Sequence, residues 1–243
     1  MDFLRQLLAK QKKLHFTLVD PENQTPAEAG NRAALCKSYG TDAVMIGGST
    51  VPTREVVHET IAEIKKQSGL PTILFPNSAT AVSANADYIF YMMLMNSTDR
   101  RFLLGEQIKA AKFIQDNGIK PISMAYIVIS MSREPTTVEK VAKLDRIGEN
   151  DIDKAVEYAL AAKFLNMECI YLEAGSGAEK PVPNAMIRAV KDASNLTVIV
   201  GGGIRDGKTA KEKTESGADI IVNGSLSEKD SGKIKEIISA IKN

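Results

Sequence analysis

The chain has 243 residues, close to the usual size of one β/α barrel, and its 44% hydrophobic content is enough for one sizeable core. Its 31 basic and 30 acidic residues nearly balance. The Lys and Arg clusters that a broad nucleic-acid surface needs are absent, so we expect no nucleic-acid partner. Cys36 and Cys169 lie far apart, without CxxC or Cys/His spacing, so neither a zinc site nor a disulfide framework is predicted.

The opening segment, FLRQLLAKQKK (residues 3–13), is typical of a short amphipathic helix. It lacks the apolar core and the cleavage site of a signal peptide. No stretch of the chain approaches the roughly 18–20 apolar residues of a membrane span. The narrow apolar face could make peripheral contact with a membrane, but packing of the helix beneath a barrel is favoured. We therefore expect a cytoplasmic protein.

Short apolar runs bounded by turn residues recur eight times along the chain. Their near-continuous Val, Ile and Leu content is typical of parallel strands that are buried on both faces. The predicted strands are residues 15–20, 43–47, 72–75, 88–94, 122–128, 168–173, 197–200 and 219–223. Helical periodicity marks residues 27–39, 56–68, 105–117, 152–166, 184–193 and 208–216. This alternation favours a closed (β/α)8 barrel over an open sheet, in a single domain spanning residues 1–243, because no linker or composition shift divides the chain.

Two connections break the alternation. The segment PNSATAVSANAD (residues 76–87) is short, small and polar, and it is a poor helix former. The sequence therefore predicts an α/β fold of the modified TIM-barrel type that lacks the third helix. The second connection, residues 129–151, is long and polar and contains Pro135 and Gly148. At that length a functional lid is favoured over a spacer.

Three consecutive loops near the end of the chain carry glycines at predicted strand ends, where barrel enzymes place their chemistry. They are YLEAGSG (171–177), VGGGIRDG (200–207) and VNGS (222–225). Each glycine by itself could merely permit a tight turn. Because glycines let backbone N–H groups approach an anion, and because Ser176 and Ser225 add hydroxyl donors, three converging loops favour a phosphate site.

On the other side of the predicted mouth, LVDPEN ends the first strand at Asp20, and IGGST after the second strand supplies Ser49. One carboxylate and one hydroxyl with open water positions suit Mg²⁺, which is usually held by few protein ligands together with substrate phosphates. Alternatively, Asp20 caps the turn before Pro21.

Glu173 lies at a strand end beside the phosphate loops, and the strand alternation points Tyr171 to the same mouth. Glu173 could act as a general base, orient a substrate hydroxyl, or form a structural ion pair. The two histidines, His15 and His58, have no nucleophile or carboxylate at a telling spacing, so both are interpreted as structural.

The fourth predicted strand region, DYIFYMMLMNS (residues 87–97), is rich in Met and aromatic residues. Plain core packing would explain this composition. However, a missing third helix beside it would open a groove, and flexible Met side chains suit a long, irregular apolar ligand.

Together these motifs resemble the geranylgeranylglyceryl phosphate synthases of archaea and their bacterial relatives, the heptaprenylglyceryl phosphate synthases. The resemblance covers nearly the whole chain. Its motifs are the LVDP, IGGS, FPN, NS, PVP and VNGS segments and, most specifically, YLEAGSG and GGGIR. It implies a barrel without its third helix and a Mg²⁺-dependent transfer of the C20 prenyl group of geranylgeranyl diphosphate to the 3-hydroxyl of sn-glycerol 1-phosphate, which forms the first ether bond of archaeal membrane lipids. Dimers or hexamers are typical of the archaeal members.

Carried over position by position, the resemblance implies that Asp20 and Ser49 bind Mg²⁺ with the diphosphate, and that Tyr171 and Glu173 belong to the catalytic site. Phe102 would limit prenyl length. Leu18 favours the archaeal branch, because bacterial members carry Lys there. The implied glycerol 1-phosphate site comprises Tyr171, Leu172, Glu173, Ala174, Gly175, Ser176, Gly177, Gly202, Gly203, Gly224 and Ser225, of which Gly224-Ser225 departs mildly from the family's usual turn.

Three alternatives stay open at this point. A heptaprenyl-using enzyme would differ only in donor length. Another phosphate-binding barrel enzyme would share the late glycine loops but would have no reason to lose a helix. A non-catalytic sugar-phosphate module would need neither Asp20 with Ser49 nor an apolar groove.

Overall fold

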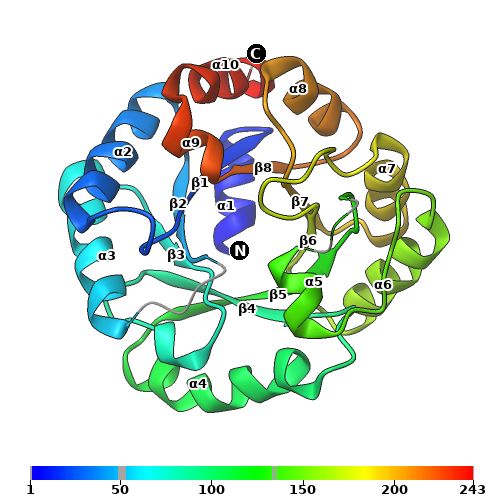
Figure 1. Ribbon diagram of the computed structural model, residues 1–243, viewed down its shortest axis with the longest axis horizontal. Helices are drawn as coiled ribbons and strands as arrows, with labels where there is room; N and C mark the ends of the chain where they lie inside the picture. The colour runs from blue at the N-terminus through cyan, green and yellow to red at the C-terminus, as the bar shows by residue number, and fades with distance from the viewer. Residues whose placement is uncertain (1, 49–52, 133, 135, 243) are drawn as a thin grey trace.

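A computed structural model describes residues 2–48, 53–132, 134 and 136–242, which form a closed barrel of eight parallel strands in chain order (Figure 1). β8 closes the ring by pairing with β1, where Phe16 lies opposite Val222. The strands are β1 (Leu14–Val19), β2 (Ala43–Ile46), β3 (Thr72–Leu74), β4 (Tyr88–Leu94), β5 (Lys120–Val128), β6 (Cys169–Glu173), β7 (Thr197–Gly201) and β8 (Ile220–Asn223). The predicted barrel is confirmed, and the predicted strand ends differ from these by at most two residues.

Helices form the outer ring of the barrel (Figure 1). They are α2 (Pro26–Tyr39), α3 (Arg54–Ser68), α4 (Glu106–Asp116), α6 (Ile152–Phe164), α7 (Asn184–Ser194), α8 (Gly207–Glu215) and α10 (Ser231–Lys242), with the short α5 (Thr137–Ala142) and α9 (Ser225–Lys229) at strand ends. Local sequence sets their limits. In α2, Thr25 and Glu28 form a capping box at the start, and Gly40 ends the helix in the left-handed conformation.

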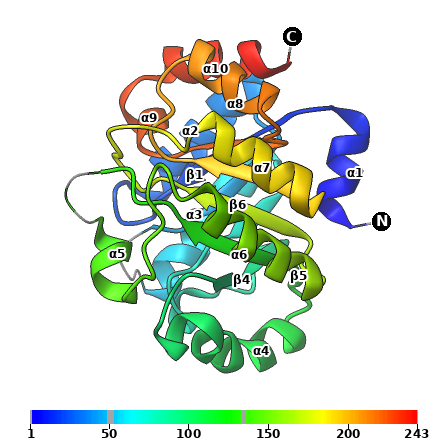
Figure 2. The same cartoon turned by 90° about the vertical axis from the view of Figure 1, so that its right-hand side faces the viewer.

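The first helix, α1 (Phe3–Lys10), closes the amino end of the barrel, at the opposite end from α5 (Figure 2). Its Leu4 is buried in the cluster that fills the barrel interior, and the Phe3 ring stacks on Tyr88 at a centroid distance of 3.9 Å. The expected packing of this helix beneath the barrel is confirmed. Within the described part of the chain, every helix is too short or too polar to cross a membrane.

The third helix of the barrel is missing, as predicted. Between β3 and β4 the chain forms only a 3₁₀ turn, η1 (Ala79–Ala81). β3 pairs with β4 only at Ile73–Tyr88 and Leu74–Ile89, whereas β4 pairs with β5 along its whole length. The part of β4 beyond Ile89 therefore has no strand on its β3 side, which leaves an opening in the barrel wall.

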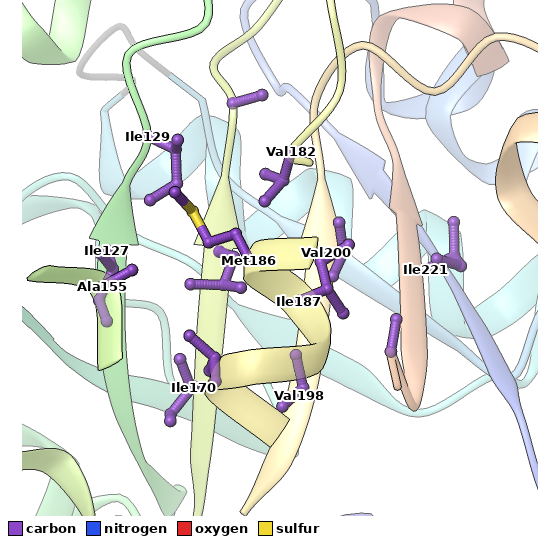
Figure 3. Packing of buried hydrophobic residues seen from close by; sticks show 14 of the residues in the cluster. Ile127, Ile129, Ala155, Ile170, Val182, Met186, Ile187, Val198, Val200 and Ile221 are labelled. Carbon is purple, nitrogen blue, oxygen red and sulfur yellow. The ribbon is translucent and has the colours of Figure 1, made fainter. Parts of the chain in front are cut away.

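Strand alternation divides the core into an interior cluster and outer layers beneath the helices. In one outer layer, Met186 and Ile187 of α7 pack against Ile170 of β6 and Val198 and Val200 of β7 (Figure 3). Side chains that point inward at the carboxyl strand ends, in contrast, face the mouth of the barrel, where barrel enzymes hold their substrates.

The long β5–α6 connection is tied to the end of β4. Ser97 Oγ donates a 2.6 Å hydrogen bond to Ala142 O, and Asn96 Nδ2 donates to Asp145 O at 3.2 Å. Ser97 also forms an isolated antiparallel bridge with Leu144. These contacts hold α5 at the carboxyl end of the barrel.

Candidate active site

The residues predicted to carry chemistry gather at one end of the barrel. Asp20 follows β1 directly and Glu173 ends β6. Because all eight strands are parallel, their carboxyl ends lie on the same side. Asp20 and the segment 171–177 therefore share one mouth, as the sequence predicted.

Glu173 and Tyr171 form an acid–phenol pair on β6, in which Tyr171 is buried and Glu173 is partly buried. The Tyr171 hydroxyl hydrogen-bonds the Glu173 carboxylate, and Gly175 N–H donates to Glu173 Oε1 at 2.8 Å. Burial raises the pKa of Glu173 above its ordinary value, although these two hydrogen bonds oppose the rise. Burial and the charge of Glu173 raise the pKa of Tyr171 well above its ordinary value, so the phenol stays protonated. The pair offers a carboxylate that can accept a proton and a hydroxyl that orients it.

Glycines around Glu173 are required by close approach. Gly202 has a φ of +79°, and a Cβ there would lie 2.6 Å from Glu173 Oε1. A Cβ at Gly201 would collide with the Tyr171 hydroxyl. The β7 loop is thus packed against the acid–phenol pair, with its main chain close to the mouth.

Arg205 joins the β6 and β7 loops. Its Nη2 donates to Ala178 O at 2.6 Å and its Nη1 donates to Glu179 O at 3.1 Å. Two of the three predicted phosphate loops, those after β6 and β7, are therefore directly connected.

The remaining predicted phosphate-site residues differ in how their side chains lie. Leu172 and Ala174 are fully buried in the outer core, so only their main chain can face a ligand. Ser176 and Ser225 are exposed, and Ser225 begins α9 beside Gly224. Hydroxyl contributions from these two serines stay a prediction.

Asp20 has the environment of a single carboxylate ligand for Mg²⁺. It is partly buried, and burial raises its pKa. Glu22 N–H donates to Asp20 Oδ1 at 3.1 Å, while Oδ2 accepts no hydrogen bond from any described residue. A Cβ at Gly48 would collide with this carboxylate, so the glycine keeps its space open. Ser49, the other predicted ligand, lies outside the described residues.

In the described ranges, no three His, Cys, Asp or Glu side chains are grouped as a metal cage. Mg²⁺ does not require one, because it is commonly held by one or two carboxylates plus substrate phosphates. The oxygen donor of Asp20 therefore fits this ion when a diphosphate supplies further ligands.

An apolar groove opens between η1, β4, α4 and α5. It begins at Gly48, beside Asp20, and passes the opening in the barrel wall to Ile114 of α4. Its lining includes side chains of the barrel interior, such as Phe90 and Leu94, and of the outer layer, such as Ile89. The predicted groove beside the missing helix is confirmed, and the Met- and aromatic-rich strand β4 lines it.

Aromatic rings connect the groove to Glu173. Tyr126 lines the groove and lies 5.5 Å from the Tyr171 ring, centroid to centroid. Phe75, also in the lining, is 5.3 Å from Tyr126 and 5.6 Å from Tyr171. The groove, the acid–phenol pair and Asp20 are thus parts of one site.

Sequence reasoning missed several groove residues. Val138 and Val141 of α5 line the groove, as do Glu106 and Gln107 at the start of α4. The valine spacing in TVEKVA indicates one apolar helix face, but the face could not be assigned without knowing what α5 lies against. Phe102 does line the groove, and its role in prenyl length stays a prediction.

The histidines and cysteines lie outside this site. His15 is fully buried between Thr41 and Asn223, and His58 contacts Ser83 and Asn85. Both cysteines are buried and free. The structural interpretation of these residues agrees with the contacts.

The chain is similar over its whole length to proteins of one family. The PcrB family model matches residues 6–242. The geranylgeranylglyceryl phosphate synthase of Methanosarcina acetivorans is 45% identical over 98% of this chain and 97% of its own length, and that of Thermoplasma volcanium is 42% identical over 100% and 97%. The crystal structure of (S)-3-O-geranylgeranylglyceryl phosphate synthase from Thermoplasma acidophilum, in complex with its substrate sn-glycerol-1-phosphate, has a TM-score of 0.94 at 37% identity and covers 100% of this chain and 99% of that one.

Proposed function

The chain belongs to the PcrB family, and from this we propose that it is a geranylgeranylglyceryl phosphate synthase, a prenyltransferase that joins the geranylgeranyl group of its diphosphate to sn-glycerol 1-phosphate. Named relatives of 42–46% identity support the activity. One observation in the structure carries the assignment to a prenyl donor: the apolar groove begins beside Asp20 and contacts the aromatic rings next to Glu173.

Each substrate fits a different part of the site. The loops after β6, β7 and β8 suit the phosphate of glycerol 1-phosphate, because each loop contains glycine, which has no side chain to keep an anion away from the main chain. The groove suits the long hydrocarbon tail of the donor, because its walls are mainly aliphatic and aromatic. The diphosphate head of the donor then lies on the Asp20 side of the mouth.

The reaction breaks the bond between C1 of the prenyl group and the diphosphate and forms a bond between C1 and the glycerol 3-oxygen. Glu173 accepts the proton of that hydroxyl, while the Tyr171 hydroxyl holds the carboxylate in position. The phosphate loops orient the acceptor, so that its oxygen is aligned with C1. Mg²⁺, held by Asp20 and by Ser49, would supply positive charge to the leaving diphosphate.

The remaining aspects of the proposal follow from the family. We expect a cytoplasmic homo-oligomer, whose subunit number sedimentation would determine. Peripheral membrane contact is expected only insofar as the lipid product has to leave the groove.

The decisive assay offers the chain prenyl diphosphates of graded length with glycerol 1-phosphate and its enantiomer. The proposal predicts the fastest ether formation with the C20 donor and sn-glycerol 1-phosphate. Preference for a C35 donor would support the heptaprenyl alternative, and binding of glycerol 1-phosphate without any product would support a non-catalytic module.

A further inference from the structure

Gln107, the second residue of α4, connects three parts of the groove wall. Its Nε2 donates to Met92 O of β4 and, at 3.3 Å, to Phe102 O in the turn that precedes α4. The Tyr91 hydroxyl donates to Gln107 O at 2.8 Å. Gln107 itself lines the groove. The start of α4 is therefore attached to the strand beside the opening in the barrel wall.

The bond to Met92 O replaces a missing strand contact. β3 pairs with β4 only as far as Ile89, so Met92 lies on the unpaired part of β4. A main-chain carbonyl next to an apolar groove needs a donor, because leaving it unpaired out of contact with water is costly. The Gln107 amide supplies that donor from the neighbouring helix.

The orientation of the amide is determined by its partners. Both are carbonyl oxygens, so the amide nitrogen has to face them, and a flipped amide would place Oε1 against two acceptors. Consequently Oε1 is buried and has no hydrogen-bond partner among the described residues. An unsatisfied buried acceptor is unfavourable for stability, and such local violations are typical of functional sites.

The turn held by this amide is irregular. Residues Arg101–Gly105 form a π-helical turn, η2, before α4 begins. π-helical turns are rare and occur frequently at functional sites. Phe102 on this turn lines the groove and packs against the interior cluster of the barrel. Its main chain is held by the Gln107 amide and by its own N–H, which donates to Asp99 O at 3.1 Å.

We propose that Gln107 is a positioning residue for donor selection: by fastening η2 to β4, it holds the Phe102 ring in the groove and so limits the length of the prenyl chain that fits. This inference rests on the proposed function. Without the amide, Phe102 O of η2 loses its link to Met92 O of β4, although the Tyr91 hydroxyl still holds the main chain of Gln107. The ring can then withdraw, and longer donors gain access.

The test is a double-mutant cycle between Gln107 and Phe102, read as the ratio of kcat/KM for a C25 donor to that for the C20 donor. Gln107→Met keeps the length of the side chain but removes both donors. We expect it to raise the ratio roughly tenfold, the size of effect that loss of one or two hydrogen bonds supports. Phe102→Ala alone should raise the ratio at least as much, and adding Gln107→Met to Phe102→Ala should then change it less than twofold.

Gln115→Met is the matched control, because Gln115 is exposed on the same helix, and it should leave the ratio unchanged. Thermal unfolding of each variant identifies a folding defect. If Gln107→Met does not fold, Gln107→Asn, whose amide falls short of both carbonyls, takes its place with the same expected result.

The inference would be overturned by an unchanged ratio in the Gln107 variant. It would also be overturned if Gln107→Met changed the ratio equally in the wild type and in Phe102→Ala. Neither result would contradict the proposed function. A wild-type chain that joins no prenyl donor to glycerol 1-phosphate would overturn the proposed function and this inference with it.

Discussion

At the scale of single residues, the two carboxylates of the mouth have different surroundings. Glu173 receives hydrogen bonds from the Tyr171 hydroxyl and from Gly175 N–H, whereas Asp20 Oδ2 is open at the rim beside Gly48. Burial raises the pKa of both. A carboxylate that is held in place suits proton transfer, and a carboxylate with an open oxygen suits a cation.

Glu173→Gln should lower kcat about 100-fold or more, because the amide cannot accept the proton of the glycerol hydroxyl. The KM or Kd for glycerol 1-phosphate should change only slightly, since the amide keeps the shape of the side chain. Steady-state kinetics with calorimetric binding would separate the two effects. Glu179→Gln, an exposed position in the same loop, is the control. Equal losses in turnover and binding would indicate a purely binding role.

Asp20→Asn should shift the Mg²⁺ titration of activity to markedly higher concentrations, because the neutral amide attracts the cation less strongly. The measurement is initial rate against Mg²⁺ concentration at saturating substrates. Glu157, exposed on α6 of the outer ring, offers the control Glu157→Gln, which should titrate like the wild type. A titration of Asp20→Asn that overlays the wild-type curve would remove Asp20 from the metal site.

At the scale of secondary-structure elements, the groove exists because η1 replaces a helix, and a single side chain of α4 spans its two walls. Glu106 Oε2 accepts from Ala79 N–H of η1 at 2.8 Å, while Oε1 accepts from Arg101 Nε at 3.1 Å and from Lys109 Nζ at 2.9 Å. Burial opposes the charge of Glu106, but these hydrogen bonds outweigh it and lower its pKa. The η1 wall is thus fastened to α4 across the groove.

Glu106→Ala should therefore reduce kcat/KM for the prenyl donor by roughly tenfold, chiefly through KM, because the groove loses its fixed width. The KM for glycerol 1-phosphate should hardly move, since the phosphate loops lie on β6, β7 and β8. Kinetics with each substrate varied in turn would show this difference. Asp116→Ala, at the exposed end of the same helix, should behave like the wild type, whereas similar losses for both substrates would point to general damage.

At the scale of the whole molecule, the barrel closes where the first and last strands meet, and a buried histidine lies at this junction. His15 of β1 contacts Thr41 Oγ1 at 2.5 Å and Asn223 Oδ1 of β8 at 3.2 Å. Complete burial lowers the pKa of His15 to about 4. The neutral ring thus joins β1 and β8 to Thr41 in the turn before β2.

Stability should consequently fall as the pH falls from about 6.5 to about 4. In this window the unfolded chain binds a proton at His15 and the folded chain does not, which removes about 3 kcal/mol of unfolding free energy. Urea unfolding at pH 7 and pH 4 measures the loss. In His15→Gln, the loss of unfolding free energy between pH 7 and pH 4 should be smaller by about 3 kcal/mol. In His58→Gln, at an exposed position of α3, the loss should equal that of the wild type. Equal losses in wild type and His15→Gln would contradict the role assigned to burial.

Much of this architecture is visible in the sequence because its causes are local. Strand and helix periods recur within a few residues, so the eight strands and the missing third helix could be predicted. The same holds for the end of the barrel that carries Asp20 and Glu173, since parallel strands place their carboxyl ends together.

Only the tertiary structure decided how the groove is built and held. Its walls combine Gly48, Phe75, Tyr126 and Val141, which lie far apart along the chain. The bond of Gln107 to Met92 O depends on where β3 stops pairing with β4. Periodicity indicates which side of a helix or strand is apolar. The pairs of elements that contact each other are determined by packing between segments remote in sequence, and no local pattern encodes these contacts.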